Sequence, residues 1–432
     1  MTATVDALIE VDAAPAPDRA ARSTPSGRDA PLSPEPDAAG GTRKRLDHID
    51  AMRPVKQAGV IGTHTLLAFA PVAATVAAGA SLMLLHVTRE AFLFVSACML
   101  TFSYGQTKRM DLGPFFRRRF WSVGVPYLCW TLIYFLFLLP TTYQSLPTAL
   151  GHLGYLMATG YYQLYYLIVV AQFYVVFPLL LLLVRRTAGH HRALLAVSGA
   201  IQLLTVSLMH WNLLPPDMRG FWASREITSY QFYLIAGMVV AFHLDAVHAW
   251  LTSHVRLLVV TTVVSAAIAE AWYYLGADNV VGWLGSSSDP FQPIVIPFNI
   301  GAIACIYLIG VALVDRRRSR PLRAMVQSGS DNAYGIYLAQ MIFITVLGWL
   351  GWRNLDSVLP WPLVAVVTVA VVFVACIALT ALLARTPWSK ALTGRSRASW
   401  ASLVPRRRTV AAPASGQRTT VAEPGDSPLE PA

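Results

Sequence analysis

The sequence predicts an all-α, polytopic integral membrane protein with about ten transmembrane helices and both termini in the cytoplasm. The chain is 55% hydrophobic and only 13% charged, whereas soluble domains carry about 25% charged residues. Apolar runs of about 20 residues, the length that crosses a hydrocarbon core, recur along the chain. Short clusters of Lys and Arg separate these runs, in the pattern that orients inserted helices.

Ten apolar runs make up the expected membrane domain, residues 46–385. Their approximate spans are 54–74, 77–104, 122–140, 163–184, 191–211, 226–246, 255–275, 294–314, 331–351 and 362–384. The flanking segments 1–45 and 386–432 are rich in Ala, Pro, Ser and Gly and lack hydrophobic periodicity. We therefore expect both segments to be disordered cytoplasmic tails.

The distribution of positive charge tests this topology. With the N-terminus inside, the cytoplasmic segments hold most of the cations, at Arg43–Arg45, Lys108–Arg109, Arg117–Arg119, Arg185–Arg186, Arg192, Arg256, Arg316–Arg318, Arg320, Arg323, Arg385 and Lys390. The outer loops hold only Arg219, Arg225 and Arg353. This alternation favours the ten-helix count. It also excludes nucleic acid as the expected partner despite a net charge of +11, because the cations do not form one surface. The expected partner is the lipid bilayer, and the expected location is the plasma membrane.

Few ionisable side chains fall within the predicted helices, where each costs several kcal/mol and is a candidate for function. The candidates singled out are His64, His86, Arg89, Glu90 and Glu270. The four cysteines form no CxxC pair and the loop histidines lack partners at ligand spacing. We therefore expect no metal site.

Arg53 precedes His64 by eleven residues, in RPVKQAGVIGTH. Eleven helical residues rise about 16 Å and rotate by three turns plus about 20°, so the two side chains would share a face. Pro54 suits a first helical turn, which would place Arg53 at the helix cap. The functional hypothesis is a cation that holds an anionic donor and an imidazole that acts as a base. The alternative is a topological anchor and a structural histidine.

Glu90 lies about 21 Å from the cytoplasmic end of the second predicted helix by helical rise, near the expected depth of His64. A carboxylate beside His64 would fix its tautomer, so Glu90 is a candidate catalytic residue. His86 and Glu90 can share a face, whereas the adjacent Arg89 and Glu90 point about 100° apart and are not expected to pair directly. A structural role for Arg89 and Glu90 is the alternative, and the isolated Glu270 is expected to be structural.

Arg117, Arg118 and Arg119 stand just before the third predicted helix, in GPFFRRRFWSVGVPYLCW. A group of arginines suits a phosphate-rich ligand such as coenzyme A. The alternative is a cluster that only orients the helix.

Five segments follow one another along the chain, namely MRPVKQAGVIGTH, FLFVSACML, FFRRRFWSVGVPYLCW, QLYYLIVVAQFYVVFPLL and SDNAYGIYLAQ. In this order they resemble the membrane acyltransferase 3 family over about residues 46–384. Arg53 and His64 map onto the R-x10-H motif of that family. The departures from its pattern are Ala97 for a glycine, Ser122 for the second arginine of an R-x-x-R, and Ala333 and Gln340 for the serine and histidine of the late motif.

The resemblance implies an O-acyltransferase that modifies surface polysaccharides, lipids or small molecules. Acyl-CoA would be the donor, with its phosphates held by Arg53 and Arg117–Arg119, and His64 would act as the base or carry the acyl group. The acceptor would be a hydroxyl of a glycan, lipid or secondary metabolite, approached through the outer loops 141–162 and 276–293. One alternative is a transporter or exporter of a glycan or lipid, which should show paired acidic groups along a path. A receptor or scaffold is supported only by the polar tails.

Overall fold

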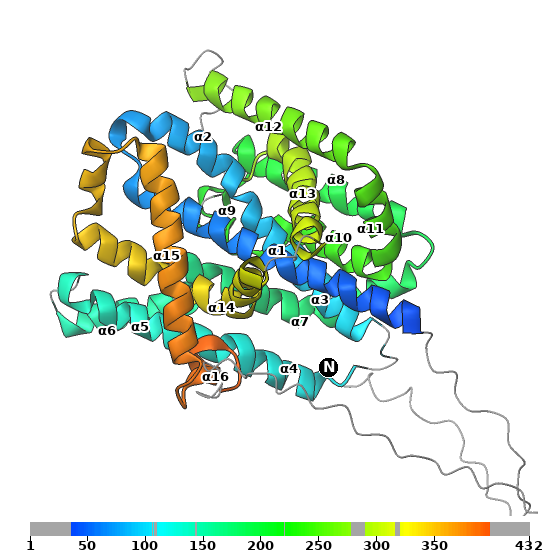
Figure 1. Cartoon of the computed structure of the whole chain (residues 1–432), viewed down its shortest axis with the longest axis horizontal. Helices are drawn as coiled ribbons and strands as arrows, with labels where there is room; N and C mark the ends of the chain where they lie inside the picture. The colour runs from blue at the N-terminus through cyan, green and yellow to red at the C-terminus, as the bar shows by residue number, and fades with distance from the viewer. Residues whose placement is uncertain are drawn as a thin grey trace, which may run out of the picture. The chain divides into compact units, whose positions relative to one another are not determined.

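The computed structural model describes residues 36–105, 107, 110–142, 145–219, 221–277, 290–315 and 320–397, and every regular element in these ranges is helical (Figure 1). Residues 44–432 group into one compact unit, and the architecture described below belongs to it. Residues 1–35 and 398–432 of the predicted tails lie outside the described ranges. The described parts of both tail segments contain helix, because α1 begins at Pro36 and a helix, α16, spans Ser389–Thr393.

The chain forms sixteen α-helices within the described ranges. Their bounds are α1 Pro36–Phe69, α2 Thr75–Leu85, α3 Val87–Tyr104, α4 Leu112–Arg119, α5 Val125–Thr142, α6 Leu146–Thr159, α7 Tyr165–Arg186, α8 His191–His210, α9 Pro216–Arg219, α10 Gln231–Phe242, α11 Leu244–Ser253, α12 Val255–Ala277, α13 Ile296–Asp315, α14 Arg320–Trp349, α15 Trp361–Leu383 and α16 Ser389–Thr393. Short 3-10 turns occupy Val72–Ala74, Tyr162–Leu164, Ile227–Tyr230, Pro293–Val295 and Trp352–Ser357. A π-helical turn, Phe120–Gly124, joins α4 to α5.

Eight helical segments among the described residues are long and apolar enough to cross a membrane, or nine if α10 and α11, which are bent by 100°, form one span. The prediction of an all-α polytopic membrane protein is therefore confirmed. The expected first span, in α1, is not among these segments, and its apolar stretch is interrupted by Arg53, Lys56 and His64. The count of ten spans and the cytoplasmic location of both termini therefore remain predictions.

Three local predictions differ from the structure. The expected helix cap at Arg53 was wrong, because α1 begins at Pro36 and Pro54 lies inside it. Helix-forming residues precede Pro54, so the helix continues outside the apolar run. The second predicted span is divided at His86 into α2 and α3, and the predicted outer loop 141–162 contains α6.

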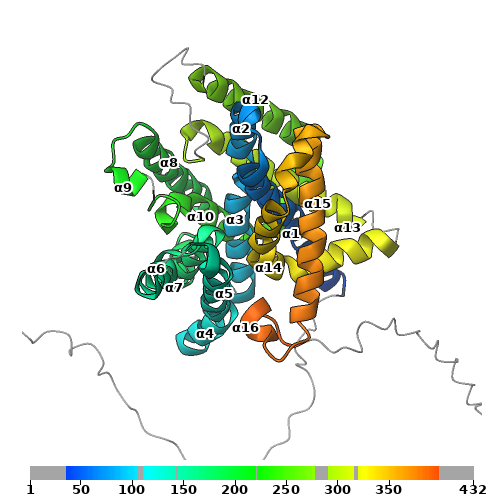
Figure 2. The same cartoon turned by 90° about the vertical axis from the view of Figure 1, so that its left-hand side faces the viewer.

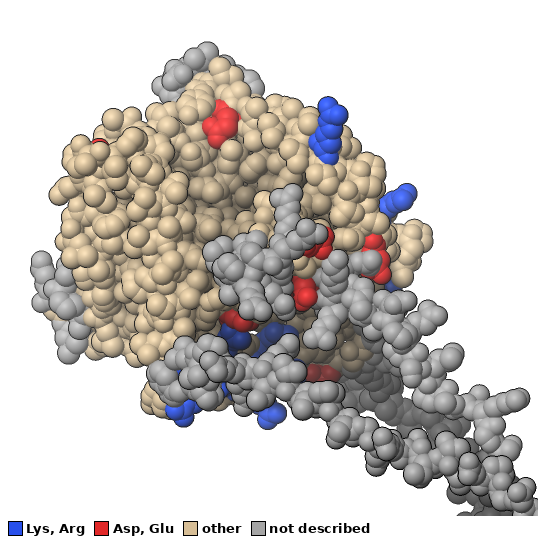
Figure 3. Space-filling view, in the orientation of Figure 1, with Lys and Arg blue, Asp and Glu red and all other residues tan. Residues whose placement is uncertain are grey.

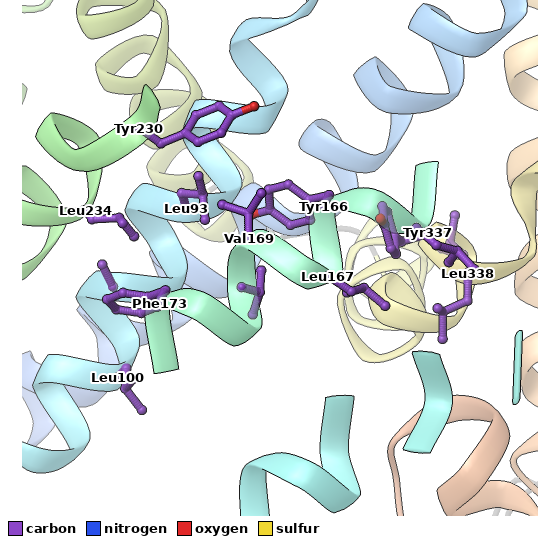
Figure 4. Close-up of a cluster of buried hydrophobic side chains, with 14 of the residues drawn as sticks. Leu93, Leu100, Tyr166, Leu167, Val169, Phe173, Tyr230, Leu234, Tyr337 and Leu338 are labelled. Carbon is purple, nitrogen blue, oxygen red and sulfur yellow. The ribbon is translucent and has the colours of Figure 1, made fainter. Parts of the chain in front are cut away.

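The largest helix–helix contacts join one pair that is distant in the sequence and two pairs that are consecutive. α3 packs along α10, α14 along α15, and α12 along α13. Figures 1 and 2 both place α3 and α14 inside the bundle and α12 and α15 at its periphery. Leu93, Phe173, Leu234 and Leu338, one each from α3, α7, α10 and α14, are fully buried where these helices meet (Figure 4).

The peripheral helices present an apolar surface. Val263 and Ile268 on α12, and Val366 and Val374 on α15, are exposed. In Figure 3, most of the visible face carries no Lys, Arg, Asp or Glu, and most of the charged residues lie toward its lower and right-hand parts, apart from acidic residues near its top and upper left. This distribution is that of a protein whose sides contact lipid while its charged residues lie near the membrane boundary.

Candidate functional site

Two cavities lie beside α1. One, of about 300 Å³, is lined by residues of α1, α3, the α6–α7 connection and α7, and by Arg225 and Tyr337. The other, of about 550 Å³, is lined by residues of α1, α3, the α4–α5 junction, α7, α14 and residues 393–395. We call the first the histidine cavity, after His64, and the second the arginine cavity, after Arg53.

Residues on a single face of α1 line both cavities. Arg53 and Lys56 line the arginine cavity, whereas Val60 and His64 line the histidine cavity. These residues follow one another at intervals of three or four positions, which is the spacing of one helix face. α1 therefore brings Arg53 and His64 to two adjacent cavities.

His64 is the candidate catalytic group of the histidine cavity. Its ring lies beside that of Tyr162, with 5.1 Å between the centroids. Its Nδ1 atom is buried and has no hydrogen-bond partner among the described residues. A buried polar atom without a partner costs free energy unless water or a ligand meets it. The imidazole is therefore placed to act on a bound molecule.

The turn that carries Tyr162 is conformationally restricted. Tyr162 has a φ of 35° and Gly160 a φ of 82°. A bulky residue at positive φ is strained, and such strain concentrates at functional sites. At Gly160 an added Cβ would lie 2.5 Å from the Cα atom of Tyr165. Only glycine fits this turn, which positions Tyr162 against His64.

Arg89 and Glu90 form a buried ion pair, with 3.2 Å between Nη2 and Oε1. The expectation that these adjacent residues would not pair was wrong, because the long arginine side chain reaches its neighbour across the difference in direction. Arg89 lines the histidine cavity, whereas Glu90 lines neither cavity. The structure therefore does not bring the Glu90 carboxylate to the cavity wall that carries His64.

Aromatic groups enclose the Arg89 guanidinium. Its Nη1 atom donates to the Tyr165 hydroxyl at 3.4 Å. Its Cζ atom lies 5.1 Å from the ring centroid of Tyr230 and 4.7 Å from that of Phe291. These contacts and the Glu90 carboxylate offset the cost of burying the cation.

Four cationic residues line the arginine cavity, namely Arg53, Lys56, Arg119 and Arg395. Arg53 Nη2 lies 2.9 Å from Asp50 Oδ1, at the end of α1 that precedes the apolar run. Partial burial raises the pKa of Asp50, and the Arg53 guanidinium opposes that shift. Arg53 therefore reaches the cavity already bound to a carboxylate.

Lys56 is the most buried of these cations, with only 1% of its surface exposed. Its Nζ atom lies 4.2 Å from the ring centroid of Phe92. No acidic side chain among the described residues forms an ion pair with it. Burying an unpaired ammonium costs free energy, so a bound anion would stabilise the charged form of this amine.

Of the three arginines before α5, only Arg119 lines the cavity. Arg117 and Arg118 are exposed on α4. Arg119 ends α4, and the π-helical turn that follows it contributes Ser122 to the cavity wall. The Arg119 Cζ atom lies 5.2 Å from the ring centroid of Tyr174. A π-helical turn inserts an extra residue and changes the directions of the side chains around it, often at functional sites.

Phe92, Tyr166 and Tyr337 line both cavities, and we call them the aromatic partition. Their ring centroids are separated by 6.1 Å between Phe92 and Tyr166, 6.5 Å between Phe92 and Tyr337, and 6.0 Å between Tyr166 and Tyr337. Figure 4 shows Tyr166 of α7 and Tyr337 of α14 among the buried side chains. The cavities are thus adjacent and are separated by aromatic rings.

The remaining candidates differ in position. His86, between α2 and α3, lines the histidine cavity. Glu270 is half-buried on α12, and the fully buried Gln340 lies on α14, and neither residue lines a cavity. Ala333 lines the arginine cavity, and its carbonyl accepts a hydrogen bond from Gln57. Within the described part of the chain, no group of three or more His, Cys, Asp or Glu residues could hold a metal ion.

A family model described as an acyltransferase domain matches residues 47–380. The chain belongs to this acyltransferase family. The matched region includes every residue that lines the histidine cavity and all those of the arginine cavity except residues 393–395. Comparisons with curated proteins and with solved structures gave no match. The protein is a multi-pass membrane acyltransferase, as the sequence resemblance predicted.

Most of the cavity residues of this acyltransferase were not among the candidates predicted from the sequence. Those not predicted include Lys56, Tyr162, Tyr166, Arg225 and Tyr337. Two signals were present in the sequence. Lys56 is a charge inside the first predicted span, and the segment YYQLYY at 161–166 concentrates tyrosines at the end of an apolar run. The positions of Arg225 and Tyr337 depend on tertiary packing and have no local signal.

Proposed function

We propose that this membrane acyltransferase moves an acyl group, acetyl in the simplest case, from acyl-CoA to a hydroxyl of a surface glycan, a lipid or a secondary metabolite. The observation that carries the proposal is a cavity lined by cations next to a cavity lined by His64, both on α1. Membership of the acyltransferase family supports the reaction class. We place the enzyme in the plasma membrane.

The arginine cavity suits the donor. Arg53, Lys56 and Arg119 offer charge-assisted hydrogen bonds to phosphate groups. In the predicted topology this cavity faces the cytoplasm, where acyl-CoA is present. The helical rise from Arg53 to His64 is about 16 Å, a distance that the extended pantetheine arm of coenzyme A can span. The thioester would pass the aromatic partition to approach His64.

His64 would act as a general base. The imidazole takes the proton of the acceptor hydroxyl while that oxygen attacks the thioester carbonyl carbon. The new carbon–oxygen bond forms, the carbon–sulfur bond breaks, and the CoA thiolate takes up the proton from the imidazolium. Aromatic walls keep water from competing with the acceptor.

The histidine cavity suits a hydroxylated acceptor. Tyr162, Gln163, Tyr165 and Arg225 line it, and they supply aromatic faces, hydrogen-bond donors and acceptors together. These groups can pack against a sugar ring and orient one of its hydroxyls. Tyr162 lies in the predicted outer loop 141–162, whereas residues 278–289 of the other predicted loop lie outside the described residues.

The test uses the purified full-length protein in detergent or vesicles, radiolabelled acetyl-CoA and a panel of hydroxylated acceptors. Transfer of label to an acceptor together with release of CoA is the expected result. A transporter of glycan or lipid would move its cargo across the vesicle membrane without acylating it. Cargo movement with no transfer and no CoA binding would contradict the proposal.

Arg119→Gln should raise the KM for acyl-CoA about tenfold and leave kcat nearly unchanged. The size follows from a charge-assisted hydrogen bond of about 1.5–3 kcal/mol. Arg118→Gln is the matched control, because Arg118 is adjacent in sequence but exposed. Steady-state kinetics with varied donor would check the prediction. Equal KM values for the two variants would remove Arg119 from the donor site.

Lys56→Met should weaken donor binding by about tenfold and, at the same time, leave the protein as stable as wild type or more stable. Methionine retains the apolar stem but removes a buried cation with no acidic partner among the described residues, whose burial costs free energy. Opposite changes in function and stability are typical of binding sites.

Thermal unfolding and donor titration measure the two effects. Lys390→Met is the control, since the exposed Lys390 lies over the Trp121 ring, 5.3 Å from its centroid, outside the cavity. If Lys56→Met destabilises the protein and does not change donor affinity, the assignment is wrong.

A further inference from the structure

The chain does not leave the bundle at the end of α15. α16 packs against α5, and the Trp130 Nε1–H group donates to the Leu392 carbonyl at 2.8 Å. Ser389 and Thr393 on α16 are each only 1% exposed. These residues follow the family-matched region, which ends at residue 380. The segment is thus a packed part of this chain that the family match does not cover.

A tight turn after α16 directs the chain to the arginine cavity. Gly394 has a φ of 68°, and an added Cβ would lie 3.0 Å from the Ser122 carbonyl oxygen and 3.0 Å from the Tyr334 ring. The Ser389 hydroxyl donates to the Arg395 carbonyl at 3.0 Å and closes the turn. The backbone conformation and the close approach both require glycine here. The turn therefore fixes where Arg395 begins.

Thr393, Gly394 and Arg395 line the arginine cavity together with Arg53, Lys56 and Arg119. The Arg395 guanidinium donates to the Asp331 carbonyl, and its Nη2 atom lies 3.8 Å from Asp331 Oδ1. The two side chains are 51% and 45% exposed, so this ion pair is weak. Among the residues that the structure describes, Asp331 is the only acidic one lining the cavity. Because Arg119 forms no ion pair among the described residues, the wall retains positive charge.

We propose that residues 393–395 form a wall of the donor site and that Arg395 binds a phosphate of the nucleotide part of acyl-CoA. This inference rests on the proposed function. Arg395 would exchange its loose contact with the Asp331 carboxylate for a charge-assisted contact with phosphate, which arginine forms in bidentate geometry. The donor site would thereby depend on a segment outside the family-matched region.

The test compares two donors on full-length variants. Acetyl-CoA carries the nucleotide phosphates, and S-acetylpantetheine carries the same thioester without any phosphate. Arg395→Gln should lower kcat/KM for acetyl-CoA by about 3- to 10-fold, through KM, and leave the value for S-acetylpantetheine unchanged. Arg397→Gln is the matched control, because Arg397 donates to the Arg385 carbonyl and does not line the cavity.

A second variant tests the turn. Gly394→Ala should also lower kcat/KM for acetyl-CoA selectively, because it moves Arg395. Gly189→Ala is its control, since Gly189 has a similar φ of 86° but nothing within 4 Å of the added Cβ.

Each outcome of the donor comparison decides the inference. A selective loss with acetyl-CoA supports it. An equal loss with both donors shows that the segment only maintains the fold, and no loss shows that Arg395 does not contact the donor; both results overturn the inference and leave the proposed function intact. If the wild-type protein neither binds CoA nor transfers acetyl from either donor, the proposed function fails and the inference fails with it.

Discussion

Replacing His64 by alanine should lower the rate of acyl transfer by about 10²- to 10⁴-fold, the usual contribution of a general base. The imidazole lines the histidine cavity, and its Nδ1 atom has no hydrogen-bond partner among the described residues, so its removal breaks no hydrogen bond at that atom. We therefore expect kcat to fall, with little change in the KM for acyl-CoA or in thermal stability. Single-turnover transfer of labelled acetyl to an acceptor measures the effect.

The control for this prediction is His254→Ala, because His254 is exposed after α11 and lines neither cavity. His254→Ala should match wild type in rate. Wild-type transfer by the His64 variant would remove His64 from the mechanism. A reduced rate accompanied by loss of the folded protein would assign His64 a structural role instead.

Arg89→Met should lower the free energy of unfolding by about 3–5 kcal/mol, because it leaves the Glu90 carboxylate buried without its partner. Glu90 is 3% exposed, and its Oε1 atom lies 3.2 Å from Arg89 Nη2. The same change also removes the contacts of the guanidinium with Tyr165, Tyr230 and Phe291. Denaturant or thermal unfolding of the purified protein in detergent would measure the loss.

The double variant Arg89→Met/Glu90→Gln should recover a large part of that stability, since it removes both charges. Arg192→Met is the matched control, because Arg192 is exposed at the start of α8, and it should have little effect. If the double variant is no more stable than Arg89→Met, the ion pair is not the cause of the loss. If a folded Glu90→Gln variant retains the wild-type rate of acyl transfer, Glu90 takes no part in the reaction at His64.

The fold was largely predictable because lipid imposes a strong constraint on sequence. Every buried backbone amide must be paired within a helix, so apolar runs mark helices, and those at 191–211 and 362–384 agree with α8 and α15 to within about a residue. Where a segment lies outside the lipid, this constraint on its sequence is weaker. The start of α1 at Pro36 and the additional α6 lie outside the apolar runs, and the division at His86 lies inside the run 77–104, so the positions of the runs alone indicate none of the three.

The site was predictable only where one helix contains it. Arg53 and His64 share α1, so helical spacing indicated a common face. Arg117, Arg118 and Arg119 are equivalent in the sequence, but of the three only Arg119, at the junction of α4 with the π-helical turn, lines the cavity. The pairing of Arg89 with Glu90 depends on a side-chain conformation that spacing does not determine. Tyr337 and Arg395 reach the cavities through tertiary packing.

The aromatic partition also bears on how well the membrane that contains this protein holds its electrical potential. A continuous chain of water molecules through two adjoining cavities would conduct ions and dissipate the potential across the bilayer. Three large rings lie within about 6.5 Å of one another between the cavities, and they narrow the path along which water could connect the two. We expect this partition to limit the leak of ions through the protein during the proposed acyl transfer.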